Sequence, residues 1–269
     1  MNKKVISIIV LCLILAVVVI VLLLPKEEPI TTTTDVYVYT YIENVEIPSI
    51  NSDDQIVNHT AYSLQYNELH EQADWVAYML TSDELTGSVK RKDNFRSDPM
   101  VTTGSAELKD YRRSGYDRGH LAPAADMSWS EDIMSESFYM SNMSPQKPGF
   151  NRGVWKRLEE QVRDWANKFD TLYVVTGPVL EDGLPTIGEN KVSIPKQYYK
   201  ALLVYKSNAQ TAIGFLLNNV SSSEELKSFA ITIDSLEKIT LIDFFSKLPD
   251  EFESKIESTI KTSDWFDHK

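Results

Sequence analysis

Residues 116–123 read YDRGHLAP, and two further stretches follow it in order: FYMSNMSPQ at 138–146 and FNRGVWKRLEEQVR at 150–163. In the first stretch Arg118 is a permanent cation whose planar fork suits phosphate, and His120 has a charge that changes near neutral pH. Gly119 between them lets the backbone bend or approach a ligand closely. This combination suits acid–base chemistry at a phosphate. Taken alone, the short motif favours a turn held by a structural salt bridge.

The third stretch predicts a helix over residues 151–168. At about 100° per residue its apolar side chains fall on one stripe, formed by Val154, Leu158, Val162 and Trp165. Glu159 and Arg163 fall at the edge of that stripe. Asn151 opens the helix, where polar groups and backbone N–H groups converge on anions or metals. Asn151 is therefore either an N-cap or an uncharged oxygen ligand for Mg²⁺.

Net charge taken over the whole chain argues against a nucleic-acid partner. The 269 residues carry a net charge of −12, whereas proteins that bind nucleic acids usually show a basic surface. Between Lys109 and Arg163, however, nine Lys and Arg residues slightly outnumber eight Asp and Glu residues. The segment with the motifs is less acidic than the rest, which permits polyanion binding but does not demonstrate it.

The few cysteines and histidines narrow the chemistry. Cys12 is the only cysteine, so the globular part has no disulfide, thiolate zinc site or thiol nucleophile. Histidine-dependent chemistry must draw on His59, His70, His120 and His268. A metal would be bound mainly by oxygen, which favours a hard cation such as Mg²⁺, with Mn²⁺ as a substitute.

The N-terminal residues predict a membrane anchor. Residues 5–24 contain no charged side chain and are numerous enough to span a bilayer core. The positive-inside rule places residues 1–4 in the cytoplasm and the body of the protein on the periplasmic or extracellular side. A cleaved signal peptide, which would give a secreted protein, is the alternative, although no small-residue cleavage pattern follows. Residues 25–55 are predicted as a linker and 56–262 as one globular domain.

Short runs of β-branched and aromatic residues predict strands in the globular part, at 75–80, 138–141, 172–176, 200–205 and 211–217. The polar stretch 90–99 predicts a loop, and residues 252–260 predict a late helix. Because strands and helices do not alternate regularly, the pattern favours an α+β fold over a doubly wound sheet.

Taken together, the three motifs resemble those of the DNA/RNA non-specific endonuclease family, which includes mitochondrial endonuclease G and secreted bacterial nucleases. The similarity extends from about residue 62 to 249. It implies a ββα-metal (His-Me finger) core, in which a hairpin carries the histidine and the next helix the metal ligand, beside a mostly antiparallel central sheet flanked by helices. It also implies Mg²⁺-dependent hydrolysis of DNA and RNA with little sequence specificity and with 5′-phosphate products. A homodimer is compatible with the resemblance, and nothing else in the sequence indicates one.

The resemblance assigns roles to residues of this sequence. It makes His120 the general base that activates water, and Asn151 the single direct protein ligand of Mg²⁺. Glu159, eight residues after Asn151, matches an acidic residue that holds metal-bound water. Arg118 is expected to contact the substrate or the developing charge. Asn142 is expected to orient His120 or the site as a whole.

Further arginines are expected to bind the substrate. Arg163 follows Glu159 by one helical turn, and we expect it to contact phosphate. The upstream arginine of the family corresponds to Arg91 or Arg96; we favour Arg91, but one sequence does not settle the spacing around Phe95.

Two other interpretations stay open. The first is a membrane-anchored, non-catalytic binding or envelope protein built on a decayed nuclease fold. The second is a phosphodiesterase for a smaller substrate, to which the net charge of −12 gives weight, because long-range steering of DNA would be poor. The complete set of Arg, His, Asn and Glu favours an enzyme.

Overall fold

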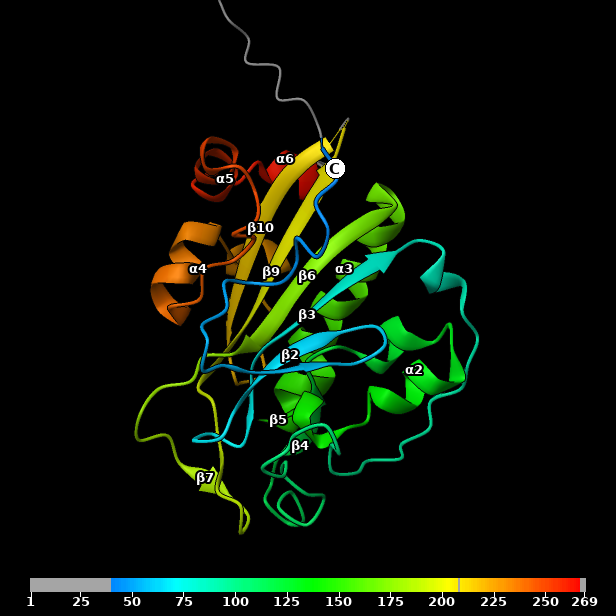
Figure 1. Ribbon diagram of the computed structural model, residues 1–269, viewed down its shortest axis with the longest axis vertical. Coiled ribbons are helices and arrows are strands. Elements are labelled where there is room, and N and C mark those ends of the chain that lie inside the picture. Colours follow the sequence, from blue (N-terminus) through cyan, green and yellow to red (C-terminus); the bar gives the residue numbers. More distant parts are fainter. Residues whose placement is uncertain (1–39, 208, 267–269) are drawn as a thin grey trace, which may run out of the picture. The chain divides into compact units, whose positions relative to one another are not determined.

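A seven-stranded sheet crosses the domain in the computed structural model, which describes residues 40–207 and 209–266 (Figure 1). The strand order is β1-β2-β3-β6-β9-β10-β11, and every neighbouring pair is antiparallel. The strands are β1 (Gln55–Asn58), β2 (Ser63–Asn67), β3 (Gln72–Thr81), β6 (Thr171–Pro178), β9 (Gln197–Lys206), β10 (Ala209–Asn218) and β11 (Ala230–Ile231). The predicted α+β class with a central antiparallel sheet is confirmed.

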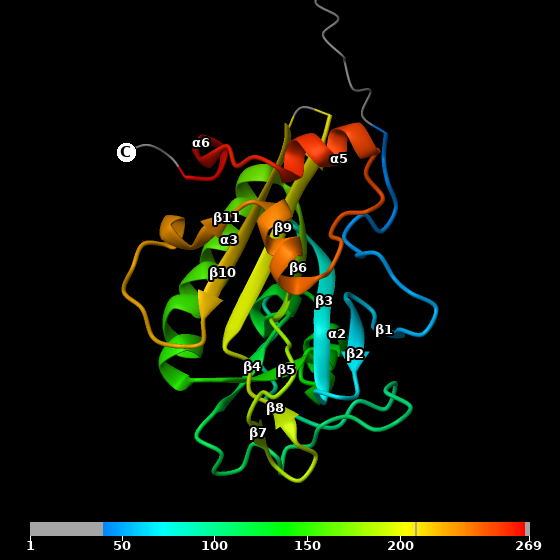
Figure 2. The same cartoon turned by 90° about the vertical axis from the view of Figure 1, so that its left-hand side faces the viewer.

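Helices cover both faces of this sheet. Helix α3 (Lys156–Phe169) lies on one face, and α4 (Ile233–Thr240) and α5 (Asp250–Glu257) lie on the other (Figure 2). Strand β9 shows the consequence: Leu202 packs in the core beneath α3, whereas Tyr205 contacts Phe252 of α5. Since side chains alternate along a strand, a strand covered on both faces is buried throughout. This explains why β9 reads as an almost continuous apolar run.

The remaining elements are short. They are the strands β7 (Thr186–Ile187) and β8 (Val192–Ser193), the helices α2 (Glu131–Glu136) and α6 (Thr262–Trp265), and the single turns η1 (Glu84–Thr86), η2 (Ala124–Met127) and η5 (Leu226–Phe229). The predicted loop at 90–99 forms no helix or strand apart from one isolated bridge between Arg96 and Tyr139.

A separate hairpin precedes α3 and forms the ββ part of the core. Strand β4 (Asp117–His120) pairs with β5 (Met143–Gln146), with His120 opposite Met143 and Asp117 opposite Gln146. The strand predicted at 138–141 was wrong, because Met140–Asn142 forms a helical turn, η3, and the strand starts one residue later. A short apolar run shows burial without showing its backbone conformation.

The helix predicted from residue 151 begins later in the structure. Phe150–Trp155 form a wide turn, η4, in which Gly153 has φ −110° and ψ −109°, and regular helix starts at Lys156. Such a backbone conformation is accessible to glycine because it lacks a Cβ. The predicted apolar stripe is confirmed, since its four side chains are at most 1% exposed.

The segment between the predicted anchor and the domain is partly packed against it. The Lys247 ammonium donates to the carbonyls of Glu43 and Asn44, and the Ser49 amide donates to the Asp243 carbonyl. The end of the segment predicted as a linker thus contacts the domain. The predicted anchor at 5–24 lies outside the described residues, within which no helix is long and apolar enough to cross a membrane.

Replacing Leu158 by Ala tests the packing of α3 on the sheet. Leu158 is fully buried, so the substitution should lower the free energy of unfolding by about 2–5 kcal/mol. Leu69, which is 73% exposed, is the matched control. Leu69→Ala should change the free energy of unfolding by less than about 0.5 kcal/mol. Urea denaturation of both variants gives the comparison; equal effects would contradict this packing.

Candidate active site

Six of the seven predicted site residues line one cavity of about 430 Å³ between the hairpin and the start of α3. They are Arg91, Arg118, His120, Asn151, Glu159 and Arg163, and Arg152 and Lys156 join them. Strand β4 contributes Arg118 and His120, η4 contributes Asn151, and α3 contributes Glu159 and Arg163. The ββα unit therefore brings together residues from the two motifs that carry the predicted base and the predicted metal ligand.

His120 is held in a largely apolar setting at the cavity wall. It is 8% exposed, and its ring lies 5.0 Å from that of Phe138 and 5.8 Å from that of Phe95. Its Nε2 is buried without a hydrogen-bond partner among the described residues, which leaves Nδ1 to face the cavity. Burial, Arg91 and Arg118 lower the pKa of His120 to about 3. The imidazole is therefore neutral at physiological pH and able to accept a proton.

Asn151 is oriented by Asp117 of β4. The Asn151 Nδ2 donates to Asp117 Oδ2 at 3.0 Å, which leaves the amide oxygen to face the cavity. Arg152 donates to both oxygens of the same carboxylate, at 2.8 and 2.6 Å. Burial alone would raise the pKa of Asp117, but the hydrogen bonds from Arg152 and Asn151 hold it below its usual range. Asp117 thus stays charged and accepts from both residues.

Glu159 lines the cavity and interacts with a buried electrostatic network. Burial raises the pKa of Glu159, Lys200 opposes this, and Asp126 adds to it. Asp126, 1% exposed, accepts from Arg163 Nη1 at 2.9 Å and from the Tyr78 hydroxyl at 2.8 Å. Arg163, which we expected to contact phosphate, therefore reaches the cavity while paired with a buried carboxylate.

Asn142 is the predicted site residue that does not line the cavity. Its side chain is fully buried and donates to the carbonyls of Ala122 and Ser137, and its Oδ1 accepts from the Ala122 amide, each at 2.9 Å. Its carbonyl also accepts from the Leu121 amide. Asn142 therefore fixes the backbone just after His120, and none of these hydrogen bonds goes to the imidazole.

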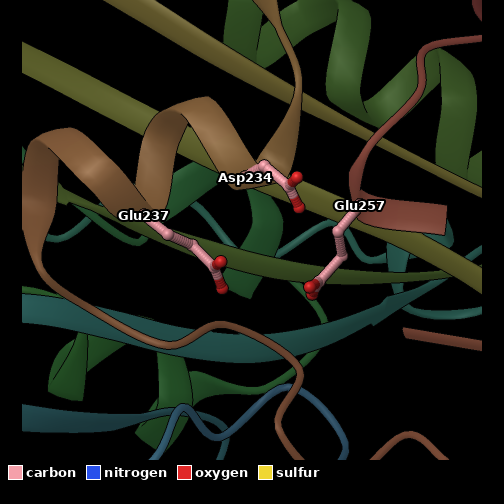
Figure 3. A group of neighbouring side chains, drawn as sticks. All are labelled: Asp234, Glu237 and Glu257. Atoms are coloured by element: carbon pink, nitrogen blue, oxygen red, sulfur yellow. The ribbon is translucent and has the colours of Figure 1, made fainter. Parts of the chain in front are cut away.

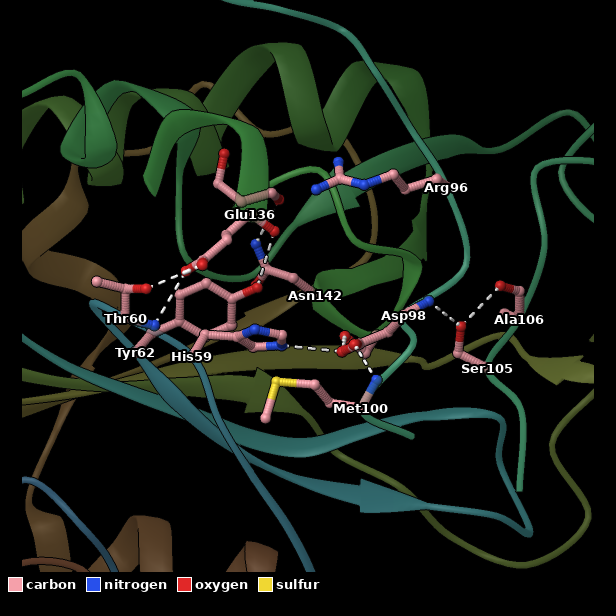
Figure 4. Close-up of polar contacts among 12 residues, drawn as sticks. His59, Thr60, Tyr62, Arg96, Asp98, Met100, Ser105, Ala106, Glu136 and Asn142 are labelled. Atoms are coloured by element: carbon pink, nitrogen blue, oxygen red, sulfur yellow. Dashed lines mark hydrogen bonds and ion pairs between the residues drawn. The ribbon is translucent and has the colours of Figure 1, made fainter. Parts of the chain in front are cut away.

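The structure separates the two arginines that the sequence left as alternatives. Arg91 lies at the cavity, with its guanidinium 4.8 Å from the centre of the Phe138 ring. Arg96 points elsewhere: its Nη1 donates to the carbonyls of Asn94 and Ser135, and it stacks over Tyr139. Figure 4 draws Arg96 in this neighbouring cluster, near the buried pair of His59 and Asp98.

Five cationic side chains and one carboxylate line the cavity, although the chain as a whole carries −12. Four of the cations also contact a carboxylate: Arg91 with Asp93, Arg152 with Asp117, Lys156 with Glu160, and Arg163 with Asp126. Arg118 has no such partner among the described residues and lies over the Phe95 ring at 4.2 Å. The cavity is thus suited to an anionic ligand.

Reasoning from the sequence missed two residues that interact with the side chains lining the cavity. Asp117 was assigned no role at the site from the sequence, yet it orients the amide of Asn151. Lys200 was not considered at all; it is fully buried in β9, donates to Thr176 Oγ1 at 3.1 Å, and interacts electrostatically with Glu159. A lysine in the middle of the apolar run at 198–204 was the available signal, because lysines are buried only when paired.

Comparisons with known proteins agree with this geometry. The family model described as DNA/RNA non-specific endonuclease matches residues 42–251. This chain belongs to that family. It is 34% identical over 223 residues to a nuclease of Nostoc sp., covering 78% of this chain and 80% of the nuclease.

Two further endonucleases are similar to this family member. Human mitochondrial endonuclease G is 33% identical over 199 residues, covering 68% of this chain and 67% of that protein. A crystal structure of the EndoG/EndoGI complex matches with a TM-score of 0.71 and 29% identity, over 80% of this chain and 92% of that chain. The resemblance, the ββα-metal fold and the enzyme class are confirmed: the protein is an endonuclease, a hydrolase that acts on nucleic acids.

Gly119 provides a test of the hairpin in this endonuclease. A Cβ at this position would lie 2.1–2.4 Å from side-chain atoms of Gln146, which is itself fully buried. Gly119→Ala should therefore lower the free energy of unfolding by about 1–3 kcal/mol, because the added methyl overpacks the hairpin. Chemical denaturation measures this loss. The double variant Gly119→Ala/Gln146→Ala should recover part of it, and strictly additive losses would contradict the contact.

Proposed function

We propose that this endonuclease hydrolyses phosphodiester bonds of DNA and RNA with Mg²⁺ as cofactor, with His120 as general base and with 5′-phosphate products. The observation that carries the proposal is that a neutral imidazole, an oriented amide oxygen and five cations meet at one cavity. A general base, a metal ligand and phosphate-binding groups are the parts that metal-assisted phosphodiester hydrolysis requires.

The residues at the cavity fit a hard cation. Asp117 occupies the N–H₂ side of the Asn151 amide, so the oxygen is the atom available for a direct bond to Mg²⁺. The Glu159 carboxylate lines the same cavity and suits a contact through water, since Mg²⁺ usually keeps several of its waters. A bound Mg²⁺ would neutralise charge on the scissile phosphate and the leaving oxygen.

His120 would take a proton from the attacking water through Nδ1. The Phe138 and Phe95 rings hold the imidazole in place, so little reorganisation is needed during the reaction. Arg91 and Arg118 keep it neutral before substrate arrives. A phosphate bound between these arginines offsets their charge, which raises the basicity of the imidazole when a base is needed.

Little sequence preference follows from the same residues. Arginine and lysine side chains at the cavity suit phosphate oxygens, and phosphate contacts carry no base information. Arg118 is best placed for this role, because no carboxylate of the described residues forms an ion pair with it. The completeness of the site argues against the non-catalytic alternative.

The location and assembly of the protein rest on other grounds. We propose from the sequence alone that residues 5–24 anchor the nuclease on the non-cytoplasmic side of a membrane. Protease added to intact cells should then digest the domain, and its full protection would contradict this location. A homodimer is proposed from family resemblance alone, and a monomeric mass in light scattering would contradict it.

His120→Ala should abolish nuclease activity. In the presence of Mg²⁺ the full chain should degrade plasmid DNA and RNA, whereas the variant should lose at least about 100-fold in rate, because no group would remain to deprotonate water. EDTA should stop the reaction of the unaltered chain, and added Mg²⁺ should restore it.

His70→Asn is the matched control for this experiment. His70 is buried, does not line the cavity, and is hydrogen-bonded to the Ser193 hydroxyl. The folded variant should therefore keep its activity within about threefold. Persistence of cleavage in His120→Ala, or in EDTA, would contradict the proposed mechanism. End-labelling of the products shows which end carries the phosphate.

Arg91→Ala and Arg96→Ala should have different effects. Arg91→Ala should lower kcat/KM roughly 10- to 100-fold, as expected for a lost charged contact to phosphate. Arg96→Ala should instead lower stability, since it removes two hydrogen bonds and the stacking on Tyr139, while the folded fraction keeps its kcat/KM. Steady-state kinetics and thermal melts of both variants distinguish these outcomes; the reverse pattern would assign the role to Arg96.

A further inference from the structure

A second group of charged side chains lies on the face of the sheet opposite α3. Asp234 and Glu237 lie one turn apart on α4, and Glu257 is the last residue of α5. Each offers a carboxylate oxygen, and these oxygens lie within 4.8 Å of one another. Figure 3 shows the three side chains pointing towards a common space from the two helices. None of them lines the active-site cavity.

Burial makes this group unusual. Glu257 is only 5% exposed, and its Oε1 is buried without a hydrogen-bond partner among the described residues. Glu253, one turn earlier on α5, also has a buried Oε1 without a hydrogen-bond partner among the described residues. Protein carboxylates in such positions are normally paired or bound to a metal, because a buried charge without a partner is costly.

No lysine, arginine or histidine of the described residues forms an ion pair with Asp234, Glu237, Glu253 or Glu257. Burial first, and then Glu237 and Glu253, raise the pKa of Glu257 to about 9. Burial also raises the pKa of Glu237 to about 7, although a hydrogen bond from the Phe244 amide opposes this. These carboxyl groups thus disfavour one another's ionisation, and a cation that binds them would displace their protons.

We propose that Asp234, Glu237 and Glu257 bind a divalent cation such as Ca²⁺. Their three carboxylate oxygens lie within 4.8 Å of one another, so one ion can contact all of them, since oxygens bind Ca²⁺ at about 2.3–2.6 Å.

The surrounding contacts define which atoms remain for the ion. The Phe244 amide donates to Glu237 Oε1 at 2.8 Å, which leaves Oε2 for the cation. Glu257 supplies a carboxylate whose Oε1 is buried without a hydrogen-bond partner among the described residues, and Glu253 adds negative charge nearby. Water would complete the coordination, since Ca²⁺ takes six to eight oxygen ligands.

The ion would join α4 to α5 and stabilise the segment between them. In that segment Leu241 and Phe245 have left-handed backbones, with φ 59° and 54°. Phe244 is fully buried and contacts Tyr199 of β9. A cation tying both helices together would favour this conformation and remove the repulsion among the carboxylates. The role is structural, and it does not depend on the proposed catalytic mechanism.

Thermal melts of the full chain in detergent test this site. All variants carry Asn151→Ala, so that the candidate catalytic metal site does not contribute. In that background, 1–5 mM Ca²⁺ should raise the Tm by a few degrees relative to EDTA, because an ion bound only by the folded state stabilises it. Adding Glu257→Gln should abolish the shift and weaken Ca²⁺ binding at least about tenfold in calorimetry.

Glu251→Gln is the matched control, because Glu251 is exposed on the same helix and lies outside the group. It should keep the full Ca²⁺ response. Glu237→Gln provides a second test if Glu257→Gln fails to fold. The proposal is overturned if Ca²⁺ leaves the Tm of the Asn151→Ala chain unchanged; a higher Tm of Glu257→Gln would then show that the carboxylates share protons instead. A Ca²⁺ shift that survives in both Gln variants would overturn it as well, by placing the ion elsewhere.

Discussion

The Asp117 carboxylate links the strand that carries His120 to the turn that carries Asn151. Its two oxygens accept from Arg152 and from the Asn151 amide, so one charged group determines how β4 meets η4. The orientation of that amide matters because its two ends differ: the N–H₂ group repels a cation and the oxygen binds one. Without Asp117 either end could face the cavity. The hairpin and the helix start form one site because of this contact.

Charge is distributed unevenly across the central sheet. On the α3 face, five cations from three separate segments line one cavity. On the face covered by α4 and α5, Asp234, Glu237 and Glu257 meet without a cation among the described residues. A protein of net charge −12 can therefore present a locally positive site to a polyanion. The acidic remainder would repel nucleic acid that approaches from other directions.

The setting of His120 combines two opposing demands. Its apolar neighbours and the nearby arginines keep the imidazole neutral, and this also makes it a weaker base. In the proposed mechanism the same arginines bind phosphate. Substrate binding would then change the electrostatic environment of the base in the direction that catalysis needs. A strongly shifted pKa is therefore compatible with a catalytic role for His120.

The sequence alone determined the family, the α+β class, the central strands and the apolar stripe of α3, because these depend on local motifs and on the spacing of apolar residues. It also named the residues that meet at the cavity, since most lie within two short motifs. It failed at 138–141, where burial was mistaken for a strand, and at the start of α3, where Gly153 interrupts the helix.

Only the tertiary structure decided between Arg91 and Arg96, and only it showed that Asn142 does not line the cavity. It also revealed the roles of Lys200 and of the carboxylates of α4 and α5. The physical reason is the same in each case. A side chain's charge state and partners depend on what packs against it, and those neighbours come from segments far away in the chain. Sequence spacing specifies neighbours along one strand or helix, whereas burial and electrostatics are set when the elements assemble.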